Sequence, residues 1–512
     1  MKQPVRLSLC LLMLMLAMGV HGQQQQKTII HIERARTQEY DERLGKDIER
    51  LIGNVILRQD STRFYCDSAH LNQKTRNFNA YGHVHINVND SLDMFSDRLI
   101  YNGITRMAEM FDSVRLIDGL TILKTQYLLY NRLTQVASYP DNGFITSEDN
   151  NLTSKKGYYD TNKKEFYFRD DVVMANPEYT AYSDTMVYNT TSEISWFYGP
   201  TIIRGKENTI YCEYGWYDTR LDQAHLSKRA SIQSMDQTLT GDKLFYDRLT
   251  GYGNAWGNVN ILDTTNKMLI KGDIGKLWED EGRSFVTGKA EAIAYDKEDS
   301  LHMHADTLFL FFDQDKKAKS MFAYYGVKFY RTSIQGKCDS LVYQMADSTI
   351  RMYSDPVLWS KENQITSDSI HIAIVNNTID SLIMYNSAFI ASRDTIKGFN
   401  QIKGKNMVAY FVENELVKVI VAGNAETIYW VREEDGSLIG IDVAKTSSMV
   451  IRMKNNEVQT INYIQQPSQA MFPEKELPSA EQKLKGFRWL EKARPMSKEA
   501  IFQGEEAENP SP

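Results

Sequence analysis

The chain has 512 residues, with 59 Lys and Arg against 66 Asp and Glu, and a formal net charge of −7. This acidic balance disfavours nucleic acid as a partner, because nucleic-acid binding needs a basic surface. The length alone would allow several domains, but no low-complexity linker interrupts the sequence.

The first 22 residues have the pattern of a Sec-type signal peptide. Lys2 and Arg6 precede an apolar run over residues 7–18, and small residues follow up to Gly22. The apolar core is shorter than the roughly 20 residues that a membrane-spanning helix needs, so a membrane anchor is the weaker interpretation. No other stretch is apolar enough to cross a bilayer as a helix. We therefore expect an exported, soluble protein that is cut after Gly19 or Gly22.

A repeat with a period of 29 residues organises the chain after residue 28. Six tyrosines keep this interval, and a second series of residues runs beside them with one step of 30 between Gly82 and Asp112. The tyrosines are Tyr101, Tyr130, Tyr159, Tyr188, Tyr217 and Tyr246, and the second series is Gly53, Gly82, Asp112, Asp141, Asp170, Gly199, Lys228 and Gly257. The tyrosine series has the same slip, since Leu71 precedes Tyr101 by 30 residues. Two markers that slip together indicate a repeated structural unit, and such periods are typical of stacked repeat architectures.

Each repeat has the pattern of β-strands. In residues 96–101, alternate residues share one face of a strand, and the Ser-Asp pair at its start favours a preceding turn. In residues 80–86, Val84 and Ile86 alternate with polar residues, as in a half-buried strand. Looser repeats continue with an acidic marker at Asp273, Asp306, Asp339 and Asp368. We expect an all-β, elongated, solenoid-like stack that forms one continuous body from residue 28 to residue 464.

The segment from residue 465 to residue 512 differs from the repeats and contains Pro467, Pro473 and Pro478. Residues 479–490 have the pattern of a short amphipathic helix. Its apolar residues would cap the last open rung of the stack or would dock a partner; they are Leu484, Phe487, Trp489 and Leu490. We expect the acidic end, residues 505–512, to be disordered.

Three cysteines remain beyond the signal peptide, and each stands directly before an acidic marker: Cys66, Cys212 and Cys338. Equivalent positions several repeats apart lie beyond the roughly 7 Å Cα separation that a disulfide allows. We therefore expect three free, mostly buried thiols.

No residue pattern specific to catalysis or metal binding is present. Two alternate-residue pairs, His83 with His85 and His302 with His304, lie on predicted strands without a Cys or carboxylate constellation around them. Solvent-facing strand residues are the better interpretation of both pairs. The sequence has no nucleophile elbow, phosphate-binding loop, zinc-protease motif or EF-hand loop. We expect no enzyme activity, no cofactor and no metal site.

The exported signal, the repeated Ser/Gly-Asp-x-Leu-x-Tyr unit and the Ala-x-Gly-x-Val-x-Ile unit resemble the OstA-like repeats of the LptA/LptC/LptD lipopolysaccharide-transport family. The resemblance covers about residues 28–464 and is strongest to the long OstA-like proteins of the Bacteroidota, which share a stretch like residues 494–499 here. It implies an open β-jellyroll of two antiparallel sheets. It also implies a periplasmic protein that binds lipopolysaccharide through its lipid A acyl chains, with association with the outer membrane as an open alternative. The expected partners are an inner-membrane transport complex and an outer-membrane LptD-like translocon, which the protein bridges head to tail.

The residues expected to line the apolar groove are placed by repeat position. One strand type provides Leu99, Tyr101, Tyr130, Met186, Tyr188, Leu244, Tyr246, Leu341 and Tyr343, and the other provides Val84, Ile86, Val114, Leu116, Val259 and Ile261. Ordinary core packing without ligand contact is an open alternative for each of them. Open sheet edges also favour end-to-end self-association.

Two other functions stay open. A periplasmic scaffold that binds protein or glycan partners would have a fully packed core without lipid. A glycan-processing parallel β-helix would need a carboxylate cluster on adjacent rungs, and the sequence shows no such cluster.

Overall fold

The computed structural model describes residues 29–503 except 41, 207, 235, 296–298, 315, 316, 377, 395, 414, 434, 455 and 456. The predicted signal peptide and the acidic end lie outside these residues. Two compact units are distinguished, Met1–Thr191 and Ser192–Pro512, which we call the N-terminal and C-terminal units. The single repeat body expected from residue 28 to residue 464 stays a prediction. Within the described part of the chain, no helix has the length and apolar character needed to cross a membrane.

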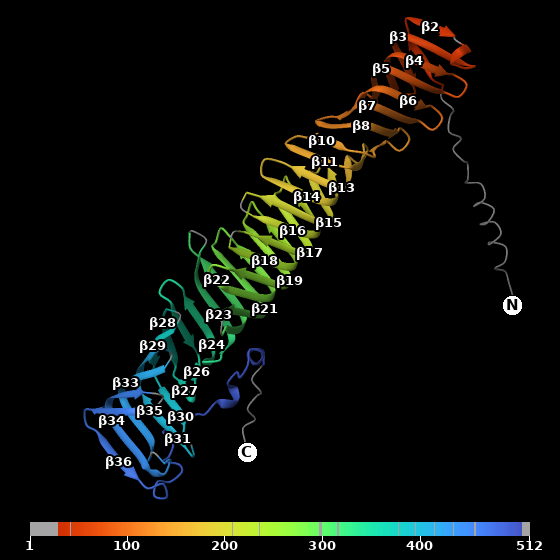
Figure 1. The fold of residues 1–512 in the computed structure, drawn as a ribbon. Helices are drawn as coiled ribbons and strands as arrows, with labels where there is room; N and C mark the ends of the chain where they lie inside the picture. Colours follow the sequence, from red (N-terminus) through yellow and green to blue (C-terminus); the bar gives the residue numbers. More distant parts are fainter. Residues whose placement is uncertain are drawn as a thin grey trace, which may run out of the picture. The chain divides into compact units, whose positions relative to one another are not determined.

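The N-terminal unit consists of antiparallel strands, drawn from red to yellow in Figure 1. Most are 11 or 12 residues long, whereas β9 to β12 are half as long because four short strands replace two long ones. The strands are β1 (His31–Arg34), β2 (Thr37–Tyr40), β3 (Ile48–Gln59), β4 (Thr62–Asn72), β5 (Asn77–Val88), β6 (Leu92–Asn102), β7 (Met107–Asp118), β8 (Thr121–Asn131), β9 (Val136–Tyr139), β10 (Gly143–Ser147), β11 (Asn150–Ser154), β12 (Lys156–Asp160), β13 (Glu165–Ala175) and β14 (Tyr179–Asn189), with a short 3-10 helix, η1 (Glu42–Leu44), after β2.

Each long strand is interrupted by a corner in its middle. Tyr81 pairs with Arg98 and Val84 pairs with Ser96, so Gly82 and His83 on β5 face only one residue on β6. Gly82 and His83 have φ angles of 72° and 43°. A Cβ atom on Gly82 would lie 2.4 Å from Asp67 Oδ2, so the close approach at this corner requires glycine.

The corners divide every repeat into two arms. The first arm contains the strand halves that carry the repeat tyrosines, and the second arm contains the halves that carry Val84 and Ile86. Residues of the second sequence series stand at the corners with positive φ angles, among them Gly82, Asp112 and Asp170. The expected two antiparallel sheets are therefore the two arms. The Ser-Asp pairs lie at mid-strand corners too, and not in the turns before strands, where we expected them.

Asparagine or aspartate closes the hairpins at the far end of the first arm. Asn102 Oδ1 accepts hydrogen bonds from the backbone N–H groups of Ile104 and Thr105, at 3.0 Å each. The same bonds recur from Asn131, Asp160, Asp218 and Asp247. Each of these residues directly follows a repeat tyrosine, so the 29-residue period also sets the turns.

The C-terminal unit repeats the two-armed arrangement, and its strands are drawn from yellow-green to blue in Figure 1. Its middle part again has short strands, because each arm there has strands of its own. The strands are β15 (Ile194–Gly205), β16 (Thr209–Asp218), β17 (Gln223–Gln233), β18 (Gln237–Asp247), β19 (Tyr252–Asp263), β20 (Met268–Trp278), β21 (Arg283–Ala294), β22 (Leu301–Phe312), β23 (Ala318–Arg331), β24 (Ile334–Gln344), β25 (Thr349–Tyr353), β26 (Val357–Ser360), β27 (Asn363–Thr366), β28 (Ser369–Val375), β29 (Thr378–Tyr385), β30 (Ala388–Arg393), β31 (Phe399–Gly404), β32 (Asn406–Val412), β33 (Glu415–Arg432), β34 (Leu438–Lys454), β35 (Glu457–Ile464) and β36 (Ser468–Phe472).

The amphipathic helix predicted over residues 479–490 is wrong. This stretch contains turns and extended chain, and only two 3-10 helices follow it, η2 (Glu491–Ala493) and η3 (Ala500–Phe502). Gly486 has a φ angle of 92°, which interrupts helical geometry. The backbone N–H of Leu484 donates to Gln401 Oε1 at 2.9 Å, so a side chain on β31 takes a bond that a helix would have made within itself.

Residues 473–503 form a strap that runs back along the C-terminal unit, blue in Figure 1. Three glutamines on the outer face of the second arm hold it. Gln401 bonds the backbone of Gln482 and Leu484, Gln364 bonds that of Arg488 and Leu490, and Gln335 bonds the Arg494 side chain. These glutamines lie in one register row, separated by Trp359 and by Ala391.

The apolar residues of the strap cover a sheet face and do not cap the last rung. Leu484, Phe487 and Trp489 pack on a small cluster of the C-terminal unit, separate from its main core. The cluster members on the sheet are Phe389, Ala391, Ile428, Trp430 and Ile441. This packing on a sheet face differs from the expected cap on the last rung, and the alternative that these residues dock a partner stays a prediction.

The expectation of free, buried cysteines is confirmed. Cys66, Cys212 and Cys338 are all unpaired and at most 6% exposed. Burial is the main cause that raises the pKa of each thiol to about 12.

Candidate functional site

The candidate site is the space between the inner faces of the two arms. All fifteen residues expected to line a groove lie on these inner faces. Twelve are buried, and Tyr246, Ile261 and Tyr343 are half-buried. The three partly exposed residues all belong to the C-terminal unit, so the two units differ in how far their interiors are filled.

The interior of the N-terminal unit is filled by its own side chains. The ring of Phe64 lies 5.1 Å from that of Phe78 and 4.7 Å from that of Tyr101. Further along, the rings of Tyr159 and Phe166 stack at 4.0 Å. All five rings are at most 1% exposed, which corresponds to a packed core.

Polar contacts join the two arms of this unit at the open side opposite the corners. Tyr101, on the first arm, donates to Gln59 Oε1 at the end of the second arm at 2.5 Å. Arg132, in a first-arm turn, donates to the Tyr101 hydroxyl at 2.6 Å and to the Gln59 carbonyl at 3.1 Å. Gln59 Nε2 donates to the carbonyl of Gly103 at 3.0 Å. We call this network the first clasp.

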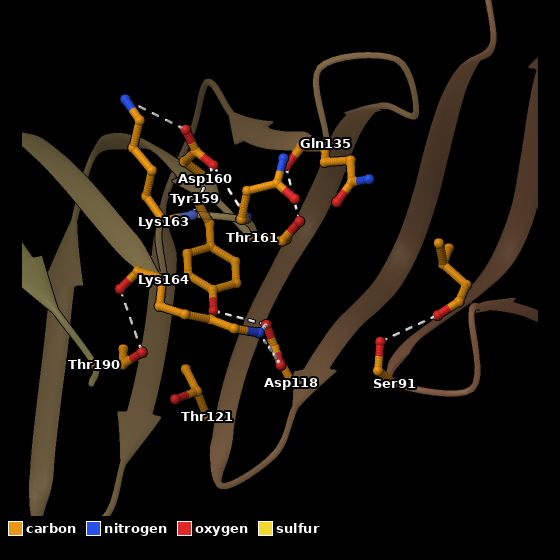
Figure 2. A network of polar contacts seen from close by, with 12 residues as sticks. Ser91, Asp118, Thr121, Gln135, Tyr159, Asp160, Thr161, Lys163, Lys164 and Thr190 are labelled. Atoms are coloured by element: carbon orange, nitrogen blue, oxygen red, sulfur yellow. Dashed lines mark hydrogen bonds and ion pairs between the residues drawn. The ribbon is translucent and has the colours of Figure 1, made fainter.

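A second clasp lies at Tyr159, the second repeat tyrosine after Tyr101, and Figure 2 shows it. Tyr159 donates to Asp118 Oδ2 at 2.8 Å, and Lys164 Nζ lies 2.7 and 2.6 Å from the two oxygens of the same carboxylate. Tyr159 and Lys164 belong to the first arm and Asp118 ends the second arm. Burial, and then the bond to Asp118, raise the pKa of Tyr159. A longer contact of 3.4 Å joins Asn150 Nδ2 to the Tyr188 hydroxyl.

The repeat tyrosines of the C-terminal unit bond within their own arm. Tyr217 donates to Asp222 at 2.5 Å, and Tyr246 donates to Glu279 at 2.7 Å. Asp222 and Glu279 lie in, or directly beside, the hairpin turns that end the first arm. Burial, followed by the bond to the carboxylate, raises the pKa of each tyrosine.

At one inward position a glycine of the C-terminal unit stands where the N-terminal unit has an aromatic residue. Gly253 is the register partner of Tyr246, as Phe78 is of Tyr101 in the N-terminal unit. A Cβ atom on Gly253 would be in ordinary van der Waals contact with Leu277 at 3.4 Å and with Tyr246 at 3.6 Å, so the position has room for a methyl group. Other small inward residues of this unit are Ala224, Ala255, Gly275, Ala290 and Ala292.

An apolar cavity of about 330 Å³ opens between the two arms of this unit. The first arm contributes Leu341 and Tyr343 together with Ile372, Ile374 and Phe411, and the second arm contributes Met268, Leu301 and Ile334. Lys267, Asp299 and Arg331 stand among its polar lining residues, and Arg331 Nε lies 3.4 Å from Asp299 Oδ2. The cavity is at the lower end of the roughly 300–1,000 Å³ typical of small-molecule pockets, and its lining is as apolar as theirs.

The residues needed for a metal site are not brought together in the described part of the chain. No three His, Cys, Asp or Glu side chains come together there as a metal site. His83 is exposed and its Nδ1 lies 2.8 Å from Asp67 Oδ2, while His302 Nδ1 lies 2.8 Å from Glu291 Oε1.

Comparison with known families finds two matches, one in each unit. Residues 27–184 match the OstA-like protein family, and residues 270–378 match the family of the LptA/(LptD N-terminal domain) LPS transport protein. The chain is similar to OstA-like proteins over residues 27–184. The first match lies in the N-terminal unit, and the second lies in the C-terminal unit. The predicted resemblance is thereby confirmed, and the families are those of lipopolysaccharide-transport proteins, not of enzymes.

One similar solved structure is LptH of Pseudomonas aeruginosa, titled as the LptA homologous periplasmic component of the conserved lipopolysaccharide transport device. It is 11% identical, the alignment covers 27% of the present chain and 95% of LptH, and the TM-score is 0.22. No curated protein matches the chain significantly.

Sequence analysis missed the clasps and the small inward residues. The clasps depend on Gln59, Asp118, Arg132 and Lys164; Gln59 and Asp118 occupy equivalent repeat positions, but no shared residue type marks them. The turn residues were detectable, because each of the six repeat tyrosines is followed by Asn or Asp. The sequence also contains Gly253 at the repeat position where Phe78 stands in the N-terminal unit. The importance of this difference is recognised only when the strand pairing is known.

Proposed function

We propose that this protein carries lipopolysaccharide in the periplasm and shields its acyl chains between the arms of the C-terminal unit. The observation that carries the proposal is the apolar cavity between these arms. Its lining lies mostly on strands β20 to β28, and the lipopolysaccharide-transport family match covers residues 270–378 of the same strands.

The energetics favour acyl chains as the occupant. Burying one methylene is worth about 0.8 kcal/mol, so ten methylenes would gain about 8 kcal/mol. Half-buried apolar side chains such as Tyr246, Ile261 and Tyr343 flank the interior and would lose water-exposed surface when a chain binds. The Arg331–Asp299 pair at the lining would stay near the polar part of the lipid.

The proposal narrows the expected groove residues to the C-terminal unit. Leu244, Val259, Leu341 and their half-buried neighbours stay as candidate lipid contacts. Tyr101, Tyr130, Tyr188 and the other expected residues of the N-terminal unit are assigned to core packing, because their unit is filled and clasped.

Export and bridging complete the proposed function. Residues 1–22 would direct the chain to the periplasm, where it would connect an inner-membrane transport complex with an outer-membrane LptD-like translocon. A scaffold role without lipid is the alternative, and the filled interior of the N-terminal unit is the observation that favours it for that unit.

The test is in-cell photo-crosslinking with a crosslinker placed singly at Tyr343, Met268, Tyr130 or Lys243. Tyr343 and Met268 line the cavity, Tyr130 is buried in the N-terminal unit, and Lys243 is exposed beside Leu244. We expect lipopolysaccharide adducts at Tyr343 and Met268 and none at Tyr130 or Lys243. Protein adducts alone at the two cavity positions would contradict the proposal and favour the scaffold.

A further inference from the structure

The outer face of the second arm in the N-terminal unit contains a concavity of about 1,210 Å³, which we call the outer channel. Outward residues next to the corners line it in register order across adjacent strands: His85, Phe95, Arg115, Lys124, Phe144 and Thr153. The His85 and Phe95 rings stack at 4.5 Å, and the Arg115 guanidinium lies 5.2 Å from the Phe95 ring centre. The floor is therefore flat, aromatic and basic.

The C-terminal unit has the equivalent row, and there the strap fills part of it. His304, Lys328 and Lys337 are the outward residues next to the corners of β22, β23 and β24. Phe502 of the strap packs on the His304 ring at 4.7 Å, and Lys328 Nζ donates to the Gln503 carbonyl at 2.7 Å. Ile501 is 1% exposed. The fold thus contains one example of a peptide bound on this face.

The two rows share an unusual charge arrangement. Lys328 pairs directly with Lys337 across neighbouring strands, and Arg115 pairs directly with Lys124. Like charges placed opposite each other destabilise a sheet, and an acceptor oxygen between them offsets that cost. In the C-terminal unit the strap carbonyl of Gln503 accepts from one member of the pair, Lys328.

Acidic groups at the rim of the outer channel do not neutralise this pair. Asp171 bonds Lys155 at 2.5 Å, so these two rim residues are matched with each other. Asp97 lies at the corner of β6 among the lining residues. Arg115 and Lys124 both have exposed side chains in the centre of the row.

We propose that the outer channel of the N-terminal unit binds an extended peptide segment of a partner protein. An aromatic side chain of that segment packs on His85 and Phe95, and a carbonyl or carboxylate oxygen accepts from Arg115 and Lys124. The occupant comes from another protein, because this chain's own strap lies on the C-terminal unit. This interaction surface is separate from the interior that the proposed function uses, so either can fail alone.

The test uses a labelled synthetic peptide with the sequence of residues 497–506 as a probe, because it has the chemistry proposed for the partner's segment: an aromatic side chain, Phe502, and three glutamates. Binding to the full-length protein is measured by fluorescence anisotropy. The double variant Arg115→Glu/Lys124→Glu is expected to weaken binding at least tenfold. The matched control Lys74→Glu/Lys163→Glu reverses two exposed charges elsewhere in the same unit and is expected to leave binding unchanged.

A photoreactive residue in place of the peptide's phenylalanine locates the site. Adducts on β5, β6 or β10 support the outer channel. Adducts only on β22 to β24 would show that the peptide merely displaces the strap, and would overturn the proposal. No binding, or equal weakening by both double variants, would overturn it as well.

Discussion

The hydroxyl of Tyr159 donates a hydrogen bond of 2.8 Å to the carboxylate of Asp118, and this bond joins the ends of the two arms opposite their corners. The equivalent Tyr246 bonds Glu279 on its own arm. One repeat position thus has different partners in the two units. The difference coincides with a filled interior in one unit and an apolar cavity in the other.

Replacing Asp118 with alanine should destabilise the N-terminal unit by about 1–3 kcal/mol, because a buried tyrosine hydroxyl and Lys164 would lose their shared partner. Chemical denaturation followed by tyrosine and tryptophan fluorescence measures the change. Asp149→Ala, at an exposed turn position of the same unit, is the control and should change the stability little. Equal effects of both variants would show that the clasp contributes nothing specific.

A bulky residue at Ala294 should reduce lipopolysaccharide binding without unfolding the protein. Ala294 lines the cavity and is exposed, so Ala294→Trp would fill space that lipid needs without crowding the core. We expect at least a tenfold loss of affinity in a binding assay with purified lipopolysaccharide. Lys243→Trp introduces the same side chain at an outward position and should bind as the unchanged protein does.

Removing the Gln364 side chain should loosen the strap. The glutamine accepts from the Leu490 N–H and donates to the Arg488 carbonyl, both at 2.7 Å. Gln364→Ala should cost about 1–3 kcal/mol and should speed hydrogen exchange in residues 482–494. Gln344→Ala lies on the other arm and should not alter exchange there. Unchanged protection in Gln364→Ala would mean that apolar packing alone holds the strap.

The stability of the C-terminal unit should depend on Asp394 at acid pH. Burial opposes ionisation of this carboxyl, but its hydrogen bonds, chiefly from Arg432 at 2.5–3.0 Å, hold its pKa below the ordinary value. A carboxyl with a lowered folded pKa stabilises the fold above the unfolded value of about 3.9, and this contribution is lost as pH falls through the folded pKa. Asp394→Asn should therefore differ from the unchanged protein at pH 6 and converge with it near pH 2 in thermal denaturation. A constant difference across this range would contradict the prediction.

The three thiols should react slowly in the folded protein. Burial raises the pKa of Cys66, Cys212 and Cys338 to about 12, so almost no thiolate forms at neutral pH. A thiol-specific chromogenic reagent should find three reactive groups only after denaturant is added. Rapid reaction of any thiol in native conditions would show that its strand opens readily.

The 29-residue period predicts the fold class because the repeated residues set the local backbone geometry of corners and turns. Residues such as Gly82 and Asp112 take positive φ angles at corners, and the residue after each tyrosine closes a hairpin. These features repeat with the backbone, so the sequence displays them directly. The strap was mispredicted because its apolar spacing fits a helix, whereas its backbone bonds go to glutamines more than 80 residues away in sequence, such as Gln401.

The sequence by itself determined the all-β repeats, the inward direction of the tyrosines and the free buried cysteines, because strand alternation and turn chemistry depend on neighbouring residues. Only the tertiary structure decided which interior is filled. That outcome depends on Asp118 meeting Tyr159 41 residues away, and on Gly253 standing where Phe78 stands in the other unit. Contacts between arms combine residues from separate repeats, so their effect on packing appears only after the strands have paired.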